Sequence, residues 1–327
     1  MRSRARALAP ILIGLLATSG AARCGFAAET VKRTDSAANP TNPLWHERKV
    51  KNYLPDMTWP EVQDLLTRSD MVIIPVGALE QHSLQGPIGT DFLNSTEEAK
   101  LIAQRTDVLV APILLPGNSP YHMEFPGTIT LSAETVERVY FEAAQSLIHH
   151  GFKRFLILNG HGGNAATSRF IVDRINQESS GIAVELGEAA ASYRPKAADR
   201  APTGPQDFDR HAGVGETSMS LYLTPTLVDL SAAKGAMLTY PPHLQAMVPK
   251  VVAGDPTANL VFLAETLKAK STGKHTSTRE MSNTGSWSVL DPKTATAERG
   301  RDETERFVSS AVKFIDAWKQ LRPLRTP

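Results

Sequence analysis

Side chains that can bind metal ions gather in three short segments of the sequence. In chain order these segments carry Glu80, His82 and Asp91, then His161, and then His211 and Glu216. Imidazole and carboxylate groups are the ligands of the zinc, manganese and iron sites that catalyse hydrolysis. Two such ions, held about 3.5–4 Å apart by a bridging carboxylate, activate water between them. The residue types therefore indicate hydrolytic metal chemistry, with all of these side chains except His211 as candidate ligands.

Each segment taken alone has a plainer explanation. A Glu-x-His pair such as residues 80–82 is common on solvated surfaces, and His211 could simply open the helix that the following apolar residues predict. The glycine-rich stretch at residues 159–164 could be a tight turn, and it lacks the Gly-x-Gly-x-x-Gly and Lys-Ser/Thr signatures of nucleotide-binding loops. A shared site is favoured because all three segments lie at the ends of predicted strands.

Alternating apolar runs and helical patterns predict the framework that positions these segments. The predicted strands are residues 71–76, 108–115, 155–158 and 181–186, and the predicted helices are residues 59–67, 94–105, 133–150 and 165–178. Continuous apolar runs are typical of strands buried on both faces of a parallel sheet. The alternation predicts an α/β fold, a three-layer αβα sandwich around a mostly parallel sheet. Such sheets bind ligands beyond the carboxyl ends of their strands, where the metal-binding side chains fall.

Composition excludes several other classes of function. The chain has 327 residues and a formal net charge of +1, so it lacks the charge excess of proteins that bind nucleic acids or anionic membranes. After the N-terminal region, no segment approaches the ~20 apolar residues of a transmembrane helix. We therefore expect a small-molecule substrate, no nucleic-acid partner and no membrane partner.

The N-terminus has the layout of a secretory signal peptide. Three arginines precede a short apolar run at residues 7–17, and Gly25-Phe26-Ala27 places small residues at the −3 and −1 positions. We expect cleavage after Ala27 and export to the periplasm or the medium; the alternative is a disordered or mitochondrial-type presequence. Cleavage would remove Cys24, the single cysteine, so thiolates would not be available as metal ligands.

The rest of the chain divides simply. The predicted division is a signal peptide at residues 1–27, a mobile linker at 28–45 and one catalytic domain at 46–323. The linker is polar and rich in proline, alanine and asparagine, as expected of a segment without a packed core. No internal repeat and no proline- or glycine-rich linker divides the predicted catalytic domain.

The candidate segments resemble, in order, the conserved blocks of the creatininase-like amidohydrolase family. The matching stretches are IPVGALEQH at 74–82 with GTD at 89–91, YHMEFPGT at 121–128, NGHGGN at 159–164, HAGVGETS at 211–218 and DPKTATAERG at 291–300. The resemblance runs from about Trp59 to Trp318. It implies an αβα fold, two divalent metal ions per subunit (Zn, Mn or Fe) and a homo-oligomer, often a hexamer.

The resemblance also implies roles for individual residues. Glu80, His82, Asp91 and His161 would be metal ligands, with Asp91 bridging the two ions. In creatinine-cleaving members, Tyr and a metal-binding Glu follow the histidine of the third block, whereas this chain has two glycines there. Glu216 is therefore the best replacement ligand, although it could instead act as a base.

Two further histidines acquire roles from the same resemblance. The family places the histidine that matches His211 beside the metals, so His211 is the candidate donor of a proton to the leaving nitrogen. His122 either lines the pocket and orients the substrate or is a structural turn residue ahead of Pro126. The expected reaction is attack on a C–N bond by a hydroxide that bridges the metals.

The substrate differs from creatinine in our interpretation. Creatinine-cleaving members close the pocket with tryptophans, one of them just before the fourth block, but residues 205–210 contain none, and Trp59 and Trp287 lie far away in sequence. We expect a hydrolase of non-peptide C–N bonds, acting on a cyclic amide, a formamide or a similar small substrate. The alternatives are a metal-dependent peptidase for short peptides, because some relatives with a Gly-Gly third block cleave peptide bonds, and a periplasmic protein that binds metals without turnover.

Overall fold

The computed structural model describes residues 48–324, apart from 115, 196–207, 236–243 and 267–276. The expected signal peptide at residues 1–27 and the expected linker at 28–45 lie outside the described residues. Within the described ranges, no helix combines the length and the apolar character that crossing a membrane requires.

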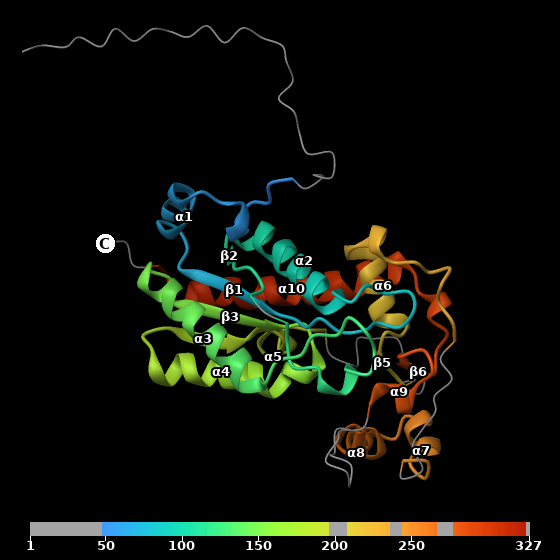
Figure 1. Cartoon of the computed structure of the whole chain (residues 1–327). Helices are drawn as coiled ribbons and strands as arrows, with labels where there is room; N and C mark the ends of the chain where they lie inside the picture. Colours follow the sequence, from blue (N-terminus) through green and yellow to red (C-terminus); the bar gives the residue numbers. More distant parts are fainter. Residues whose placement is uncertain (1–47, 115, 196–207, 236–243, 267–276, 325–327) are drawn as a thin grey trace, which may run out of the picture. The chain divides into compact units, whose positions relative to one another are not determined.

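Four parallel strands form the central sheet, as predicted (Figure 1). They are β1 (Met71–Val76), β2 (Leu109–Val110), β3 (Arg154–Asn159) and β4 (Ile182–Glu185), arranged in the order β2-β1-β3-β4. β1 and β3 pair over their full length, from Met71 opposite Arg154 to Val76 opposite Asn159. β2 is shorter than predicted because Pro112 has no N–H to donate to a neighbouring strand.

Helices cover both faces of this sheet. One face carries α1 (Trp59–Leu66), α3 (Ala133–His149) and α4 (Ala165–Glu178), and the other carries α2 (Thr90–Thr106), α5 (Leu186–Ala191) and α10 (Ala297–Leu321). Alternate side chains of β1 enter the two cores: Val72 and Ile74 pack with α3, whereas Met71 and Ile73 pack with α2 and α10. Burying each such side chain contributes roughly 1.5–3 kcal/mol. The predicted three-layer αβα sandwich is confirmed (Figure 1).

The helix α2 begins four residues earlier than predicted, at Thr90 instead of Asn94. Gly89 is its N-cap residue, and the Thr90 hydroxyl donates to the Pro87 carbonyl oxygen (2.8 Å). Asp91 therefore lies in the first turn of a helix, where the helix dipole favours a negative charge. Its position is fixed by regular structure and not by a loop.

The C-terminal part of the chain adds a third, smaller core. Its elements are β5 (Asp209–His211), α6 (Val214–Leu223), α7 (Val248–Val252), α8 (Pro256–Thr266), α9 (Thr278–Met281) and β6 (Trp287–Ser288). Short 3₁₀ helices occur at Leu54–Asp56, Pro120–His122, Gly162–Asn164, Pro225–Leu227 and Pro292–Thr294. β5 and β6 pair in antiparallel orientation, with His211 opposite Trp287. This pairing brings the segment around residue 287 to the edge of the candidate site.

The connections place a crevice at the carboxyl ends of β1 and β3. From β1 the chain crosses through α2 to β2 on one side, and from β3 it crosses through α4 to β4 on the other. Ligands bind at such a switch point because the two connections leave in opposite directions and open a crevice between them. The first two candidate segments follow these two strands directly.

Candidate metal centre

The pairing of β1 with β3 brings Glu80, His82 and His161 close together. Because Val76 pairs with Asn159, β1 and β3 end level, and the Gly160 N–H still donates to the Val76 carbonyl oxygen (2.9 Å). A Cβ at Gly160 would lie 2.7 Å from the Ser95 Cβ and 2.9 Å from the Asp91 carbonyl oxygen. Glycine at this position therefore allows α2, which carries Asp91, to approach the loop that carries His161.

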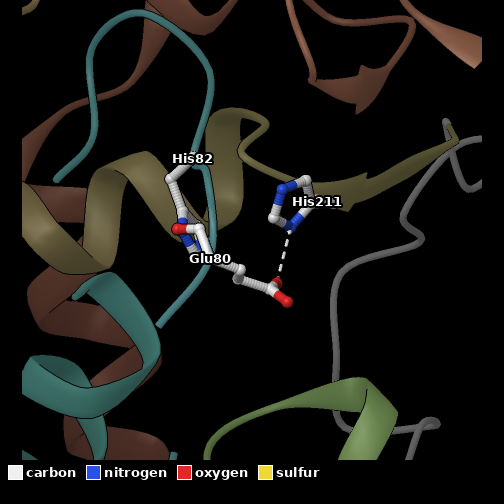
Figure 2. Close-up of side chains that lie close together, drawn as sticks. All are labelled: Glu80, His82 and His211. Atoms are coloured by element: carbon white, nitrogen blue, oxygen red, sulfur yellow. Dashed lines mark hydrogen bonds and ion pairs between the residues drawn. The ribbon is translucent and has the colours of Figure 1, made fainter. Parts of the chain in front are cut away.

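The other two side chains come from β5 and α6. His211 is the last residue of β5, and α6 begins three residues later, at Val214, so the alternative in which His211 opens the helix is wrong. The carboxylate of Asp209 accepts from the N–H groups of Val214 (3.1 Å) and Gly215 (2.9 Å). This cap separates strand from helix and leaves His211 facing Glu80, as Figure 2 shows.

The candidate ligands form three overlapping groups whose ligand atoms lie within 4.8 Å of one another. The groups are Glu80–Asp91–His161, His82–Asp91–Glu216 and Glu80–His82–His211. The first two share Asp91, whose Oδ2 lies 2.9 Å from His161 Nδ1 and whose Oδ1 lies 3.2 Å from His82 Nε2. All of these side chains are buried except that of Glu216, which is 29% exposed.

In all three groups, the far ring nitrogen of each histidine meets a backbone carbonyl oxygen. The pairs are His82 Nδ1 with Glu80 O (3.0 Å), His161 Nε2 with Asn118 O (3.1 Å) and His211 Nε2 with Gln81 O (2.8 Å). A carbonyl oxygen only accepts, so each of these nitrogens carries a hydrogen. The other nitrogen of each neutral ring therefore turns its lone pair toward the carboxylates. Metal-binding histidines are oriented by this type of contact.

The donor set fits cations. His161 Nδ1 and Asp91 Oδ2 present lone pairs to each other at 2.9 Å, which is repulsive unless a proton or a cation lies between them. Glu80 Oε2 and Asp91 Oδ2 are also buried without a hydrogen-bond donor among the described residues. Unpaired buried carboxylate oxygens are costly, whereas coordination to a divalent ion satisfies them. The residues present could hold one ion in each of the two groups that share Asp91.

The electrostatics of the ion-free cluster agree with this reading. Burial alone would lower the pKa of His82, but the carboxylates of Glu216 and Asp91 raise that pKa well above its ordinary value. Burial also acts to lower the pKa of His161, which Glu80 and Asp91 raise well above the ordinary value. Burial acts to raise the pKa of Asp91, but His82 and His161 lower it. Without metal, protons therefore occupy positions that cations would take.

His122 and His211 behave differently. Burial lowers the pKa of both rings, and the effect is increased by His211 for His122 and by His82 for His211. Both rings are thus kept neutral beside the cluster. The structure places His122 in the pocket wall, with its Nε2 3.4 Å from Glu80 Oε1. Its Nδ1 lies 2.6 Å from the Thr278 hydroxyl oxygen.

A cavity of about 380 Å³ opens onto the cluster. Besides the candidate ligands His161 and Glu216 and the catalytic candidate His211, it is lined by Tyr121 and Trp287. Sequence reasoning did not assign either aromatic residue to the site. Tyr121 adjoins His122 in the second block, which was a usable signal, whereas Trp287 enters through its pairing with His211. A larger apolar cavity of about 680 Å³ lies between α1 and α3, away from the cluster.

The second of the two glycines after His161 is explained by the packing around it, which includes Tyr121. A Cβ at Gly163 would collide with the Tyr121 hydroxyl, with His161 Nε2 and with the Asn118 carbonyl oxygen, whereas a Cβ at Gly162 would meet nothing within 4 Å. A side chain at position 163 therefore has no room. Glu216 reaches the cluster from α6 instead.

Comparisons with known proteins agree with one another. A family model described as creatinine amidohydrolase matches residues 55–315. The creatinine amidohydrolase of Pseudomonas putida is 32% identical over 210 residues, which cover 58% of this chain and 79% of that protein. The mycofactocin precursor peptide peptidase of Mycolicibacterium smegmatis is 28% identical over 255 residues, which cover 76% of this chain and 85% of that protein.

Solved structures show the same fold. A crystal structure of creatinine amidohydrolase aligns with a TM-score of 0.62 and 23% identity, covering 84% of this chain and 99% of that one. Other creatininase structures with this fold are described as a Zn–Zn form and as a manganese form.

Proposed function

Because the chain belongs to the creatininase family, we propose that it is a metal-dependent amidohydrolase with two divalent ions at the cluster around Asp91. One observation carries this proposal. The Asp91 carboxylate is shared by two groups of buried ligands, and each group contains a histidine whose lone pair is directed toward it. Zinc, manganese and iron are the ions that such a set of oxygen and nitrogen donors accepts.

The ligand assignment follows the two groups. Glu80, Asp91 and His161 would hold one ion, and His82, Asp91 and Glu216 the other. Glu216 is proposed as a ligand because its Oε1 lies 3.5 Å from His82 Nε2. Its Oε2 accepts from the Ala212 N–H (2.6 Å), which orients the carboxylate.

The reaction is addition of water to an amide carbonyl followed by cleavage of the C–N bond. When bound, the ions would supply the Lewis acidity that activates water and polarises the carbonyl. His211 is the proposed proton carrier: its Nδ1 faces Glu80 Oε1 at 3.5 Å and Glu216 Oε2 at 3.9 Å, and its lowered pKa keeps the ring able to accept a proton. The ring would return this proton to the leaving nitrogen, giving a carboxylate and an amine. His122 would orient the substrate from the pocket wall.

The favoured substrate is a small non-peptide amide, such as a cyclic amide or a formamide. A cavity of about 380 Å³ with the aromatic rings of Tyr121 and Trp287 on its wall suits a compact substrate. A second candidate is a peptidase for short peptides. It is supported by the relationship to the mycofactocin precursor peptide peptidase, which extends over 76% of this chain.

One experiment distinguishes these functions from metal binding without turnover. Metal content is measured on unstripped protein, which is then screened against lactams, formamides and dipeptides. Turnover of lactams or formamides that a chelator abolishes supports the proposal, and preferential cleavage of dipeptides supports the peptidase. Bound metal without turnover on any of the three classes would favour the non-catalytic alternative.

We also propose that the protein is exported and that it forms a homo-oligomer, with a hexamer as the expected size. The signal-peptide pattern of residues 1–27 supports export, and membership of the family supports oligomerisation. Light scattering of the purified protein tests the second proposal, which a monomer at micromolar concentration would contradict.

A further inference from the structure

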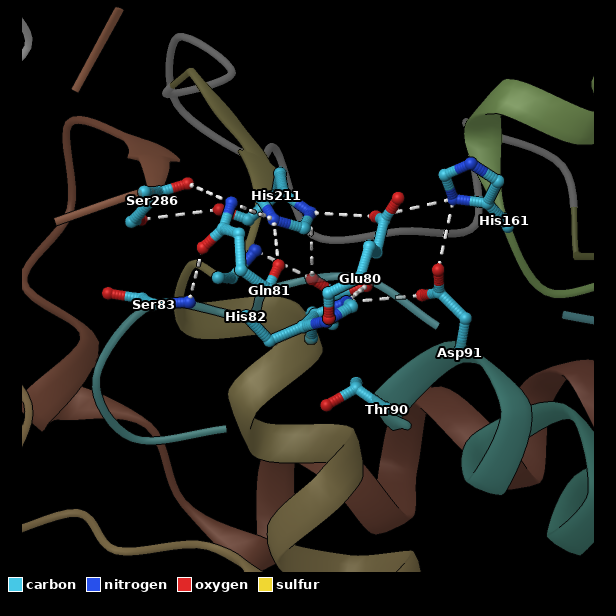
Figure 3. A network of polar contacts seen from close by, with 12 residues as sticks. Glu80, Gln81, His82, Ser83, Thr90, Asp91, His161, His211 and Ser286 are labelled. Atoms are coloured by element: carbon cyan, nitrogen blue, oxygen red, sulfur yellow. Dashed lines mark hydrogen bonds and ion pairs between the residues drawn. The ribbon is translucent and has the colours of Figure 1, made fainter. Parts of the chain in front are cut away.

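Gln81 lies between two candidate ligands in the chain, but its side chain contacts other groups (Figure 3). It is buried, with 4% of its surface exposed. Its Oε1 lies 2.8 Å from the Ser83 nitrogen and its Nε2 lies 2.9 Å from the Gly285 carbonyl oxygen. The same Nε2 lies 3.0 Å from His122 Nδ1 and 2.9 Å from His211 Nε2.

The backbone fixes the orientation of this amide. The Ser83 N–H can only donate and the Gly285 carbonyl can only accept, so the amide oxygen must face Ser83 and the amide nitrogen must face Gly285. One of the two N–H groups of Gln81 is thereby used. The second is left for one of the two histidines.

His211 cannot accept this second N–H. Its Nε2 lies 2.8 Å from the backbone carbonyl oxygen of Gln81 and therefore carries a hydrogen of its own. The remaining N–H of Gln81 thus donates to His122 Nδ1. With Nδ1 acting as an acceptor, the neutral ring of His122 has its hydrogen on Nε2, the nitrogen that lies 3.4 Å from Glu80 Oε1.

We propose that Gln81 is a positioning residue that gives the two neighbouring histidines opposite roles. The side-chain amide holds His122 with an N–H directed into the pocket, while the backbone carbonyl of the same residue holds His211 with a lone pair directed there. Their rings are 4.4 Å apart between centroids. His122 would then donate a hydrogen bond to the substrate oxygen on which negative charge develops, and His211 would accept the proton of water.

The surrounding loop is shaped to keep the amide in place. Gly285 has a φ of +89°, and a Cβ there would collide with the Gln81 amide. The Ser286 hydroxyl donates to the His211 carbonyl oxygen (3.2 Å), which fixes this loop to β5. Glycine is therefore the residue that combines this backbone conformation with room for the amide.

A competing hydroxyl shows why the amide is needed. Thr278 Oγ1 lies 2.6 Å from His122 Nδ1 and 2.9 Å from the Tyr121 carbonyl oxygen. This hydroxyl could donate to Tyr121 and at the same time accept from a hydrogen on His122 Nδ1. Without Gln81, His122 would be free to move its hydrogen to Nδ1 and would lose the N–H that faces the pocket.

Nitrogen NMR of the histidine rings tests the assignment directly. In zinc-loaded protein labelled with [¹⁵N]histidine, and in metal-free protein recorded in parallel, we expect His122 and His211 both to carry hydrogen on Nε2. In Gln81→Met, His122 should shift wholly or partly to the Nδ1–H form, whereas His211 should not change because a backbone carbonyl holds it. Hydrogen on Nδ1 of His122 in the wild type, or an unchanged His122 in Gln81→Met, would overturn the proposal.

Two variants serve as controls. Gln85 is buried in the same loop, but its amide donates to the Ala212 carbonyl oxygen (2.9 Å) and to Thr217 (3.2 Å) instead of a histidine. Gln85→Met should therefore leave both ring forms unchanged. Thr278→Val removes the competing hydroxyl and should retain the Nε2–H form of His122, so it tests the assignment even if Gln81→Met does not fold. A His122 ring that changes in either control contradicts the proposal.

The consequence for turnover rests on the proposed function, and the NMR result does not. Gln81→Met should keep its zinc content and lose about 10–100-fold in kcat, the usual cost of removing a group that orients a functional histidine. An inactive wild-type protein with the expected ring forms would refute the hydrolase and leave the assignment intact. An active protein with other ring forms would refute this inference alone.

Discussion

At the scale of single residues, the candidate site depends on where hydrogens lie on four imidazole rings. Backbone carbonyls hold the far nitrogens of His82, His161 and His211, so their lone pairs converge on the carboxylates. His122 differs from these three rings, because its Nδ1 meets the side chains of Gln81 (3.0 Å) and Thr278 (2.6 Å) and not a backbone carbonyl. The residue types could be read from the sequence, but the contacts that divide the roles among them come from distant segments.

His211 and Glu216 can be separated by substitution. His211→Ala should retain the metal content of the wild type and lose about 10²–10⁴-fold in activity, the usual effect of losing a proton-transfer group. Glu216→Gln should weaken metal binding, and excess metal should restore part of the rate. Metal analysis and kcat of both variants check these outcomes. If His211→Ala loses a metal while Glu216→Gln keeps both and is inactive, the two assignments must be exchanged.

Metal affinity should fall as the pH is lowered. Burial acts to lower the pKa values of His82 and His161, but the nearby carboxylates raise them by more. Both rings therefore hold protons at higher pH than usual. A metal must displace these protons, and more of them are bound at lower pH. Competition with a zinc chelator at pH 6, 7 and 8 should give a dissociation constant for zinc that becomes steadily smaller as the pH rises. A constant value across this range would argue against histidine ligands.

In the ion-free protein the same shifts have the opposite consequence for folding. A raised histidine pKa stabilises the folded state below the unfolded pKa, and this contribution is lost as the pH rises through the raised value. The lowered pKa of Asp91 contributes stability above its unfolded pKa, which is lost on acidification. Once ions are bound, the stability of the folded protein should therefore depend less on histidine protonation than it does in the metal-free protein.

At the scale of secondary structure, regular patterns were predictable and irregular ones were not. The predicted helix at residues 165–178 coincides with α4, and the buried apolar run at 71–76 coincides with β1. The start of α2 was not predictable because Pro87 and Gly89 are residues typical of a turn, although Gly89 serves here as the N-cap. The strand that ends at His211 was not predictable, because β5 forms only through pairing with β6, which is distant in the sequence.

The short helix after His161 gives a test at this scale. Gly163→Ala should displace the loop, because the added Cβ meets Tyr121, His161 and Asn118, and overpacking of this kind costs about 1–3 kcal/mol. We expect a lower Tm and a loss of the ion that His161 would hold. Gly162→Ala is the matched control, since its Cβ has open space. Equal Tm values and metal contents in the two variants would contradict this account of the two glycines.

At the scale of the whole molecule, fold and family could be inferred from the order of the blocks, which the family model over residues 55–315 confirms. The composition of the pocket could not. Trp287 is distant in sequence from the other site residues, yet it lines the cavity because β6 pairs with β5. Strands of two or three residues that pair over a long sequence distance have almost no local pattern, so hydrophobic periodicity does not predict their pairing.

Export is tested on the native protein. The arginines and the apolar run of residues 1–27 predict removal of this segment during secretion. Mass spectrometry of the protein isolated from its source should find a mature N-terminus within a few residues of Ala28. A chain that retains Met1 or Arg2 would contradict export by this signal.

Metal stoichiometry of the wild type and of Asp91→Ala tests whether one carboxylate serves two ions. Asp91 is shared by the two ligand groups, so we expect two ions per chain in reconstituted wild type and the loss of both in the variant. Asn94→Ala on the same helix is a matched control, because its amide contacts Ser220 (2.9 Å) outside the cluster; it should keep both ions. A wild type that cannot be loaded beyond one ion, or an Asp91→Ala variant that retains two, would contradict the shared carboxylate.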